Sequence, residues 1–325
     1  MHRRRILGAA LASAVRSMAA PTVYADAAFP NRPVRVVVPF APGGAGDAIA
    51  RVLGDRVQAE LGQSIVVENK GGGNTVIGTQ AVASARPDGY TLLQTTASNV
   101  IVAQMQENLP FDPDRAFTAV VGVGAVPLTL VVNARTGPRS IEELVAQAKS
   151  RPGTVFYSSG GTGSQTHVAP AWFAQLAGMP ATHVAFRGGG PAVQAVLAGQ
   201  VQFTFASTIA VHEMVKGGQL RLLGVTSDRR LPAYPEVPSL VEQGFADFTP
   251  ALWYGYVAPA GTPKPVIERL HAAFRRSVDD PAVHERLETL GLLVKVRGPG
   301  EFARFMQEES VRWGRVVREN RIKLE

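Results

Sequence analysis

Short apolar runs rich in valine and isoleucine alternate along this chain with longer segments in which apolar positions recur at helical spacing. In the first third, residues 34–38, 65–67 and 90–95 predict strands, and residues from about 45 onward and 75–85 predict helices. Strands that alternate with helices in this way are typical of a parallel sheet built from βαβ units. The pattern therefore predicts an α/β fold.

A second series of the same kind follows a helix that is predicted to start after Ser140, a residue type that caps helix N-termini. Two long apolar segments, 120–133 and 251–258, flank this second series, and we expect them to cross between two domains. A chain of 325 residues is long enough for two domains and a sizeable core. The second series has predicted strands at 154–158, 182–186, 201–205 and 220–226, with helices at 165–177, 190–198 and 208–217, and helices at 264–278, 281–290 and 300–320 close the chain.

Two loops join a strand to a helix through glycines. In the first, strand 34–38 is followed by two prolines, then Gly43 and Gly44, and a helix that begins near Ala45. The second, residues 158–164, contains three glycines and four hydroxyl residues before a predicted helix. A helix start leaves about four backbone N–H groups unpaired, and glycine lets a ligand approach them closely. Either loop can bind an anion, although the same features also fit an ordinary strand-to-helix turn.

The first 25 residues have the features of a signal peptide for export. Arg3, Arg4 and Arg5 form a charged start, residues 6–15 form an apolar run too short to span a bilayer, and Ala25 precedes a suitable cleavage site. The paired arginines also fit a twin-arginine signal, so the sequence leaves the export route open. We expect a periplasmic protein; the alternative is a basic, frayed N-terminus on a cytoplasmic one.

The composition is that of a globular chain, with 46% hydrophobic and 18% charged residues. Four arginines of the leader account for four of the +7 formal charges, and what remains has no basic block with interleaved aromatic side chains. Nucleic acid is therefore a poor candidate partner. The chain has no cysteine, and neither an HExxH nor a GxSxG motif, so the sequence indicates no metal, no cofactor and no hydrolase site.

Several short motifs follow one another from residue 29 onward. They are residues 29–35, residues 38–44 with Asp47, Glu68–Lys70, Pro87–Leu92, Tyr157–Ser164 with His167, Gly188–Ala192, Gly199–Val201, Leu222–Ser227, Val237–Ser239 and Ala258–Pro263. Each motif alone is weakly specific. Their order and spacing together resemble the Bug receptors, the solute receptors of tripartite tricarboxylate transporters, over nearly the whole chain after the leader.

The resemblance implies a periplasmic binding protein of the type II-like fold, with two doubly wound α/β domains joined by crossing strands and a cleft between them. We expect residues 26–131 and 250–325 to form domain 1 and residues 132–249 to form domain 2. Such receptors close on a carboxylate, which backbone amides, hydroxyls and water hold. Carried over residue by residue, the implied ligand-binding set is Phe40, Ala41, Gly43, Gly44, Asp47, Thr162, Gly163, Ser164, His167, Gly188, Gly189 and Gly190.

The resemblance further implies binding without catalysis. The expected ligand is a small organic acid, the expected partners are permease subunits of a tripartite tricarboxylate transporter or a sensor kinase, and we expect a monomer. Ala206 stands where the family often has an aspartate, which argues against an amino-acid ligand. Because a fold does not fix a function, an enzyme that uses Asp47 or His167 as acid or base is the alternative.

Overall fold

The computed structural model describes residues 29–323, so the predicted signal peptide lies outside the described residues. The strands are β1 (Val34–Val38), β2 (Ile65–Asn69), β3 (Thr91–Thr96), β4 (Phe117–Asn133), β5 (Phe156–Ser159), β6 (Thr182–Ala185), β7 (Phe203–Ser207), β8 (Leu220–Val225), β9 (Ala251–Pro259) and β10 (Leu293–Arg297). The helices are α1 (Ala45–Leu61), α2 (Val76–Ala83), α3 (Ala97–Met105), α4 (Ile141–Ser150), α5 (Gln165–Leu176), α6 (Gly189–Leu197), α7 (Thr208–Lys216), α8 (Lys264–Asp279), α9 (Pro281–Thr289) and α10 (Pro299–Glu319).

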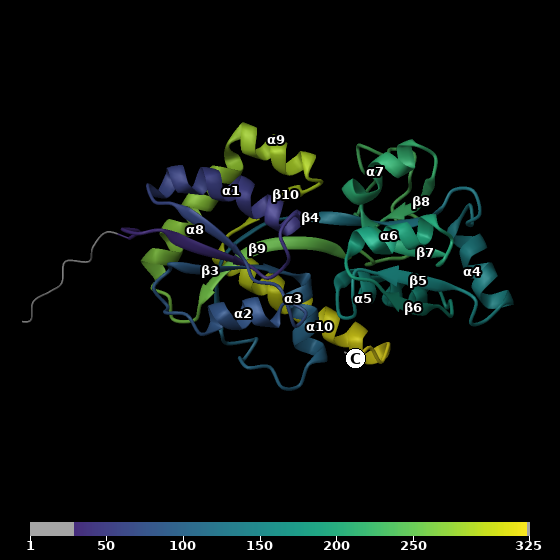
Figure 1. The fold of residues 1–325 in the computed structure, drawn as a ribbon, viewed down its shortest axis with the longest axis horizontal. Helices are drawn as coiled ribbons and strands as arrows, with labels where there is room; N and C mark the ends of the chain where they lie inside the picture. The colour runs from purple at the N-terminus through teal and green to yellow at the C-terminus, as the bar shows by residue number, and fades with distance from the viewer. Residues whose placement is uncertain (1–28, 324–325) are drawn as a thin grey trace, which may run out of the picture.

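The strands form one sheet in the order β2-β1-β3-β9-β4-β7-β5-β6, and β8 and β10 also pair with β4. Strands β1 to β3 pair in parallel, as do β5 to β7, whereas β9 and β4 run antiparallel to their neighbours. Figure 1 shows α1, α8 and α9 gathered at one end of this sheet and α4 to α7 at the other. The predicted α/β class is confirmed, with a mixed sheet at its centre.

Both predicted βα series are confirmed, but the sequence reading missed α3 and β10. The start of α3 is fixed by a capping box, in which Thr96 and Asn99 each hydrogen-bond to the other's backbone. That signal was present in the sequence. Strand β10 instead pairs antiparallel with β4, where Leu293 lies opposite Ala125. Its extended conformation depends on a partner far away in the chain, which a local pattern does not report.

Strand β4 belongs to both halves of the sheet. Its residues 117–127 pair with β9, and its residues 128–133 pair with β7 and β8. Pro127 lies at this change of partners; proline lacks the N–H donor that a central strand position normally uses. The predicted crossing segment 120–133 therefore lies within one continuous strand of 17 residues, Phe117–Asn133.

Glycines let α10 and β10 approach the central strands. A Cβ atom added to Gly124 would overlap the carbonyl oxygen of Leu293, and one added to Gly122 or Gly255 would overlap the ring of Phe302. Phe302 is fully buried near the start of α10. These glycines therefore serve close packing rather than flexibility.

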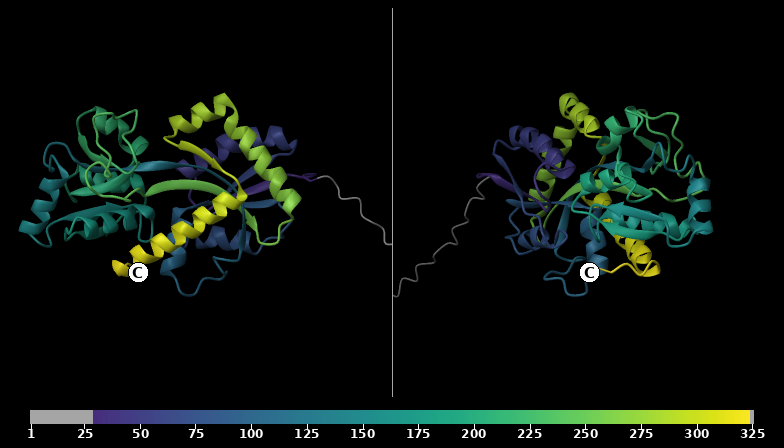
Figure 2. Two further views of the ribbon diagram at one scale, coloured as in Figure 1. Left: turned by 180° about the vertical axis from the view of Figure 1, so that it is seen from behind. Right: turned by 45° about the vertical axis from the view of Figure 1, so that its right-hand side comes forward.

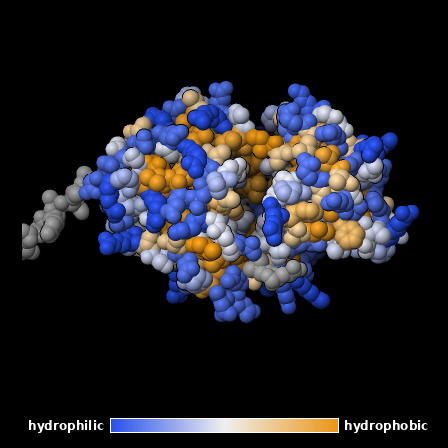
Figure 3. All heavy atoms as spheres, viewed as in Figure 1, coloured by the Kyte–Doolittle hydropathy of each residue, from blue (hydrophilic) through white to orange (hydrophobic). Residues whose placement is uncertain are grey.

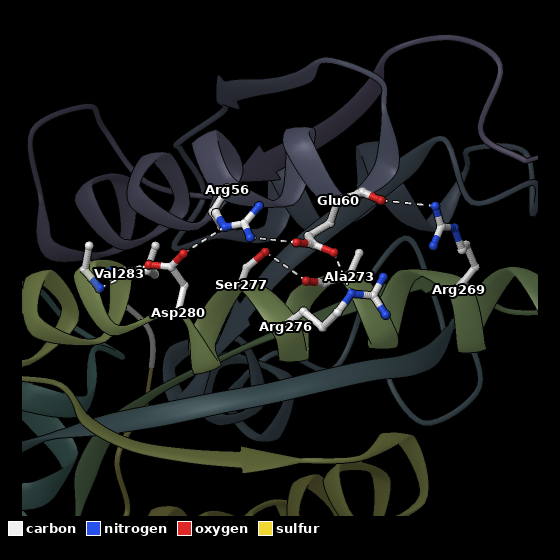
Figure 4. Close-up of polar contacts among 9 residues, drawn as sticks. Arg56, Glu60, Arg269, Ala273, Arg276, Ser277, Asp280 and Val283 are labelled. Atoms are coloured by element: carbon white, nitrogen blue, oxygen red, sulfur yellow. Dashed lines mark hydrogen bonds and ion pairs between the residues drawn. The ribbon is translucent and has the colours of Figure 1, made fainter.

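Helix α1 is tied to α8 and α9 by a chain of ion pairs (Figure 4). Arg56 pairs with Glu60 at 2.9 Å and with Asp280, which caps α9, at 3.0 Å. Glu60 also meets Arg276 of α8, and Arg269 donates to the Glu60 carbonyl oxygen at 3.0 Å. The hydrogen bond from Arg276 lowers the pKa of Glu60, and that from Arg56 lowers the pKa of Asp280. This network fixes the orientation of α1.

Helix α10 runs behind the sheet from the first half toward the second (Figure 2). Its buried Glu309 accepts hydrogen bonds from the indole N–H groups of Trp253, at 2.8 Å, and Trp313, at 2.9 Å, and pairs with Arg312. The Trp313 ring meets the edge of Trp172 on α5 with 5.9 Å between ring centres. These three tryptophans, the only ones in the chain, are called the tryptophan cluster below.

Replacing Glu309 is predicted to destabilise the protein. Glu309→Leu removes the shared acceptor and leaves two buried indole N–H groups unpaired, which costs about 1–3 kcal/mol for each group. We expect the free energy of unfolding, measured by urea titration, to fall by about 2–6 kcal/mol. Glu308→Leu, at the exposed neighbouring position, is the control and should change it by less than about 0.5 kcal/mol. Equal losses in the two variants would contradict this account of the cluster.

Candidate functional site

The first predicted loop, residues 39–44, connects β1 to α1 and is called loop one. Gly43 has φ +88°, a conformation that favours glycine, whereas Gly44 is extended with φ −83° and ψ 171°. Both glycines and Ala41 are exposed. Within residues 29–323, a Cβ atom added at either glycine meets nothing within 4 Å. The loop backbone is therefore open to a ligand.

Asp47 lies in the first turn of α1 and points back at loop one. Its carboxylate accepts a hydrogen bond from the Gly43 N–H at 2.9 Å and pairs with Arg51 at 3.0 Å. Burial alone raises the pKa of this carboxyl, but the hydrogen bonds from Arg51 and Gly43 outweigh that effect and the net pKa lies below its ordinary value. Asp47 is therefore ionised at neutral pH and already engaged by its own loop.

The start of α1 presents unpaired donors. In the described part of the chain, the N–H groups of residues 44–47 have no acceptor, and no side chain caps the helix. Behind them, Gln94 is fully buried and donates to the Gly46 carbonyl oxygen at 2.9 Å and to the Tyr256 hydroxyl at 3.3 Å. A Cβ atom on Gly46 would lie 2.8 Å from the Gln94 oxygen, so a larger residue here would have to displace the Gln94 amide.

The second predicted loop, residues 160–164, leads into α5 and is called loop two. Gly160 donates its N–H to the Thr166 hydroxyl at 3.0 Å, and the Ser164 hydroxyl donates to the Gly161 carbonyl oxygen at 2.7 Å. Gly163, with φ +79°, donates its N–H to His167 Nδ1 at 3.1 Å. Among the described residues, the N–H groups left without an acceptor in and after this loop are those of Thr162, Gln165 and Thr166.

His167 is buried beneath loop two in a stack of rings. It lies on His183 with 3.6 Å between ring centres, and His183 Nε2 is 2.6 Å from the Ser159 hydroxyl. Burial, followed by the neighbouring imidazole, lowers the pKa of His167 to about 3, and burial lowers that of His183 to about 4. Both rings are neutral at physiological pH, and the Gly163 contact places the His167 proton on Nε2.

The third group of predicted residues begins α6. Gly188 has φ +111° and donates its N–H to the Gly160 carbonyl oxygen at 3.1 Å, so this segment lies directly beside loop two. Gly189 and Gly190 are exposed, and their N–H groups have no acceptor within residues 29–323. The starts of α5 and α6 thus form one surface of backbone donors.

Both groups of loops are anchored to strand β9. Gln165 at the start of α5 donates to the Ala251 carbonyl oxygen at 2.7 Å. Gln94 joins the Gly46 carbonyl oxygen of α1, at 2.9 Å, to the Tyr256 hydroxyl of β9, at 3.3 Å, and Gly46 lies beside the Tyr254 ring. Ala251 and Tyr254 are separated by about 10 Å along the strand. Within the described residues, no hydrogen bond joins loop one to loop two. Figure 3 shows the surface hollowed between the two halves on this face.

Two of the cavities in the described part of the chain bear on the predicted set. One of about 220 Å³ between α3 and α10 contains none of the predicted residues. Thr162 and His167 border a more open pocket together with the end of the described chain, residues 320–323, and no loop-one residue lines that pocket. The predicted set is therefore brought together as two groups, loop one with Asp47 and loop two with α6, and the side chain of His167 is directed beneath its loop.

Sequence reasoning missed the buried glutamines Gln94 and Gln165. Both have no exposed surface. Gln94 donates to a carbonyl oxygen in the first turn of α1, and Gln165 donates to one on the crossing strand β9. A glutamine inside the apolar run 90–95 was a usable signal, because glutamine is rarely buried without a partner. Gln165 carried no such signal, since the first turn of a helix is ordinarily solvated.

No group of three or more potential metal ligands occurs among the described residues.

Comparison with known proteins identifies the family. The profile of the family described as tripartite tricarboxylate transporter family receptor matches residues 49–322. The chain belongs to this receptor family. It is 36% identical over 321 residues to protein BugT of Bordetella pertussis, which covers 98% of this chain and 97% of that protein. The resemblance in the sequence is thereby confirmed.

Solved structures of similar proteins confirm the periplasmic binding protein fold. The periplasmic binding protein BugD superimposes with a TM-score of 0.79 at 30% identity, covering 91% of this chain and 100% of that one. MatC from Rhodopseudomonas palustris, with bound malate, gives 0.79 at 33% identity over 89% and 100% of the chains. Rpa4515 of the same species, with adipate, gives 0.82 at 28% identity over 91% and 99%. The family consists of solute-binding receptors, and the enzyme alternative is set aside on that ground.

Acidification is predicted to weaken loop two. The folded-state pKa values of His167 and His183 lie below the 6.5 of an unperturbed histidine, so the unfolded chain binds more protons than the native one. Their contribution to stability is complete above pH 6.5 and is lost as the pH falls toward about 4. We expect a loss of up to about 1.4 kcal/mol per pH unit for each histidine in that range.

The measurement is the free energy of unfolding near pH 7 and near pH 5 for the parent and for His183→Phe, which keeps a ring in the stack. The variant should lose less stability on acidification than the parent. His284→Phe, at a more exposed histidine, is the control and should follow the parent. Identical pH dependence in the parent and in His183→Phe would show that His167 and His183 do not cause the loss of stability at low pH.

Proposed function

We propose that the protein is an extracytoplasmic receptor that captures a small organic carboxylate between loop one and the surface formed by loop two and α6. The observation that carries this proposal is the pair of donor arrays at the starts of α1 and of α5 with α6, both anchored to β9. Helix starts attract anions through unpaired N–H groups and the helix dipole. A carboxylate needs no fixed positive side chain at such a site.

Relatives support an organic acid as the ligand. MatC holds malate and Rpa4515 holds adipate, which are both dicarboxylates of small size. In this chain the second donor surface is uncharged, because His167 and His183 are neutral, and Asp47 is paired with Arg51. We therefore assign the site an anionic ligand and keep Ala206, which replaces a common aspartate of the family, as an argument against an amino-acid ligand.

The proposed cleft lies between two domains that close on the ligand. We assign residues 26–131 and 250–325 to domain 1 and residues 132–249 to domain 2, so that the chain crosses twice along β4 and β9. The change of β4 partners at Pro127 and Leu128 supports a hinge near this boundary. Closure around a crossing segment is a common motion of such two-domain receptors.

Export and partners complete the proposal. We propose that the mature protein acts in the periplasm and delivers its ligand, as a monomer, to permease subunits of a tripartite tricarboxylate transporter or to a sensor kinase. Membership in a transporter receptor family supports this placement. None of the described helices is long and apolar enough to cross a membrane.

A panel of organic acids tests the function directly. Protein that has been unfolded, stripped of ligand and refolded is heated with mono-, di- and tricarboxylates, including malate and adipate. A ligand at a hundredfold excess over its dissociation constant should stabilise the folded protein by about 2.7 kcal/mol, because it binds only the native state. Closure should also change the emission of the tryptophan cluster, which contacts both halves. A panel without any stabilising acid would contradict the proposal.

Gly44→Val is predicted to abolish carboxylate binding while the protein still folds. The extended conformation at Gly44 accommodates valine, and the added side chain would stand where the ligand has to approach the backbone. We expect affinity to fall by about a hundredfold or more, which corresponds to about 2.8 kcal/mol. Calorimetry measures it on a variant whose circular dichroism is unchanged.

Gly300→Val is the matched control, because Gly300 also has open space and lies at the start of α10, away from both loops. It should bind as the parent does. A folded Gly44→Val protein with parental affinity would place the carboxylate somewhere other than loop one.

A further inference from the structure

Asp47 and His167 occupy equivalent places in the two loops. Each accepts the N–H of the glycine four residues earlier, from Gly43 at 2.9 Å and from Gly163 at 3.1 Å. Both glycines have positive φ, +88° and +79°, and both acceptor residues are buried, with 6% of each residue's surface exposed. In each case one residue separates the glycine from the first residue of the helix. The two loops therefore share the same hydrogen bond from a glycine N–H to a side chain four residues later. The acceptor is a carboxylate in loop one and an imidazole in loop two.

In each loop, the side-chain acceptor occupies the glycine N–H, whereas the backbone N–H groups that follow at the helix start have no acceptor among the described residues. Gly43 and Gly163 have no donor left for a ligand, whereas the N–H groups of residues 44–47 and of Gln165 and Thr166 have no acceptor within residues 29–323. The bond from the glycine fixes the turn immediately before each helix. The donors that follow it are consequently held in one orientation without being used.

Neither side chain is suited to hold the anion itself. The Asp47 carboxylate would repel a ligand carboxylate; its Oδ2 accepts the Gly43 N–H, and its Oδ1 lies 3.0 Å from the Arg51 guanidinium. The His167 ring is neutral, stacked on His183 at 3.6 Å, and its Nδ1 already accepts the Gly163 N–H. Both groups were predicted as ligand contacts from the sequence.

We propose that Asp47 and His167 are positioning residues: each holds the glycine four residues before it, so that the free N–H groups at the start of its helix stay aimed at one ligand carboxylate. This inference rests on the proposed function for the ligand, but the positioning itself is a property of the unliganded protein. It assigns the carboxylate to residues 44–47 and to Thr162, Gln165 and Thr166, and it removes Gly43 and Gly163 from the set of donors.

The substitutions that test this role either keep or remove the side-chain atom that accepts the glycine N–H. Asp47→Asn keeps a side-chain oxygen that can accept the Gly43 N–H, and Asp47→Ala removes it. His167→Phe keeps a ring on His183 but has no acceptor, whereas His167→Asn offers an acceptor oxygen at the same spacing that Asp47 uses. Arg51→Gln breaks only the ion pair of Asp47 and leaves its bond to Gly43, so it controls for charge.

Hydrogen exchange in the absence of ligand tests the positioning. The segments that contain residues 43–46 and 163–166 are followed by mass spectrometry at neutral pH. In Asp47→Ala we expect exchange of the Gly43 amide in the first segment to accelerate by about tenfold to a hundredfold, because its bond to a charged acceptor is lost. In His167→Phe we expect exchange of the Gly163 amide in the second segment to accelerate by about threefold to tenfold. Asp47→Asn, His167→Asn and Arg51→Gln should remain closer to the parent than the variants that lack an acceptor.

Affinity for malate and for adipate, measured by calorimetry on the same variants, tests the functional consequence. Asp47→Ala and His167→Phe should bind whichever of these acids the parent binds at least about tenfold more weakly, and the variants that keep an acceptor should recover most of this loss. An effect of the Asp47 charge alone would not produce such rescue, since Asp47→Asn removes the charge as completely as Asp47→Ala does.

The outcomes distinguish the positioning role of Asp47 and His167 from the proposed binding of a carboxylate. Unchanged exchange in Asp47→Ala and His167→Phe overturns the positioning role, whatever the ligand is. Accelerated exchange with unchanged affinity for a bound acid also overturns it, because the loops then need no fixing for binding. Accelerated exchange in a protein that binds neither malate, adipate nor any other acid of the panel supports the positioning of the N–H groups and counts against the proposed function.

Discussion

The arrangement of the whole molecule depends on one strand that two half-sheets share. Strand β4 pairs with β9 and β10 along its first part and with β7 and β8 along its second. Because strand pairing fixes both distance and direction, the helices attached to either half are held in a defined relation to each other. Loop one and loop two reach the same face because their helices begin against β9, the neighbour of β4.

A site built from helix starts has a specific electrostatic character. Its positive potential comes from backbone dipoles and unpaired N–H groups, which do not titrate, and the nearby ionisable groups are neutralised in other ways. Asp47 is balanced by Arg51, and burial keeps His167 and His183 uncharged. Above the range in which these histidines titrate, the site keeps the same charge. Donors of this kind suit acids that differ in the rest of their structure.

The rear of the molecule couples the two halves differently. There the buried Glu309 gathers Trp253 from β9 and Trp313 from α10, and Trp313 in turn contacts Trp172 on α5. A buried carboxylate is tolerated here because both indole donors and Arg312 satisfy it. A second link lies nearby, where Gln175 of α5 bonds to Glu319 and Asn320 at the end of α10. These contacts join the two halves at the rear in addition to the strands that they share.

Elements that have local causes could be predicted from the sequence. Alternating apolar runs placed nearly every strand and helix, the glycine loops before residues 45 and 165 marked the helix starts, and Ser140 was recognised as a cap that indeed accepts the Glu143 N–H. Motif order was enough to indicate the receptor family, because spacing over a whole chain is far more specific than any single loop.

Features that depend on distant partners emerged only in the folded chain. Strand β10 is extended because β4 lies beside it, and Gln94 is buried because α1 packs over it. The directions in which the Asp47 and His167 side chains point belong to the same group: the sequence shows an acid and an imidazole near a helix start, but not their orientation. That direction is set by Arg51 on one side and by the stacked ring of His183 on the other, and no local pattern contains the second of these contacts.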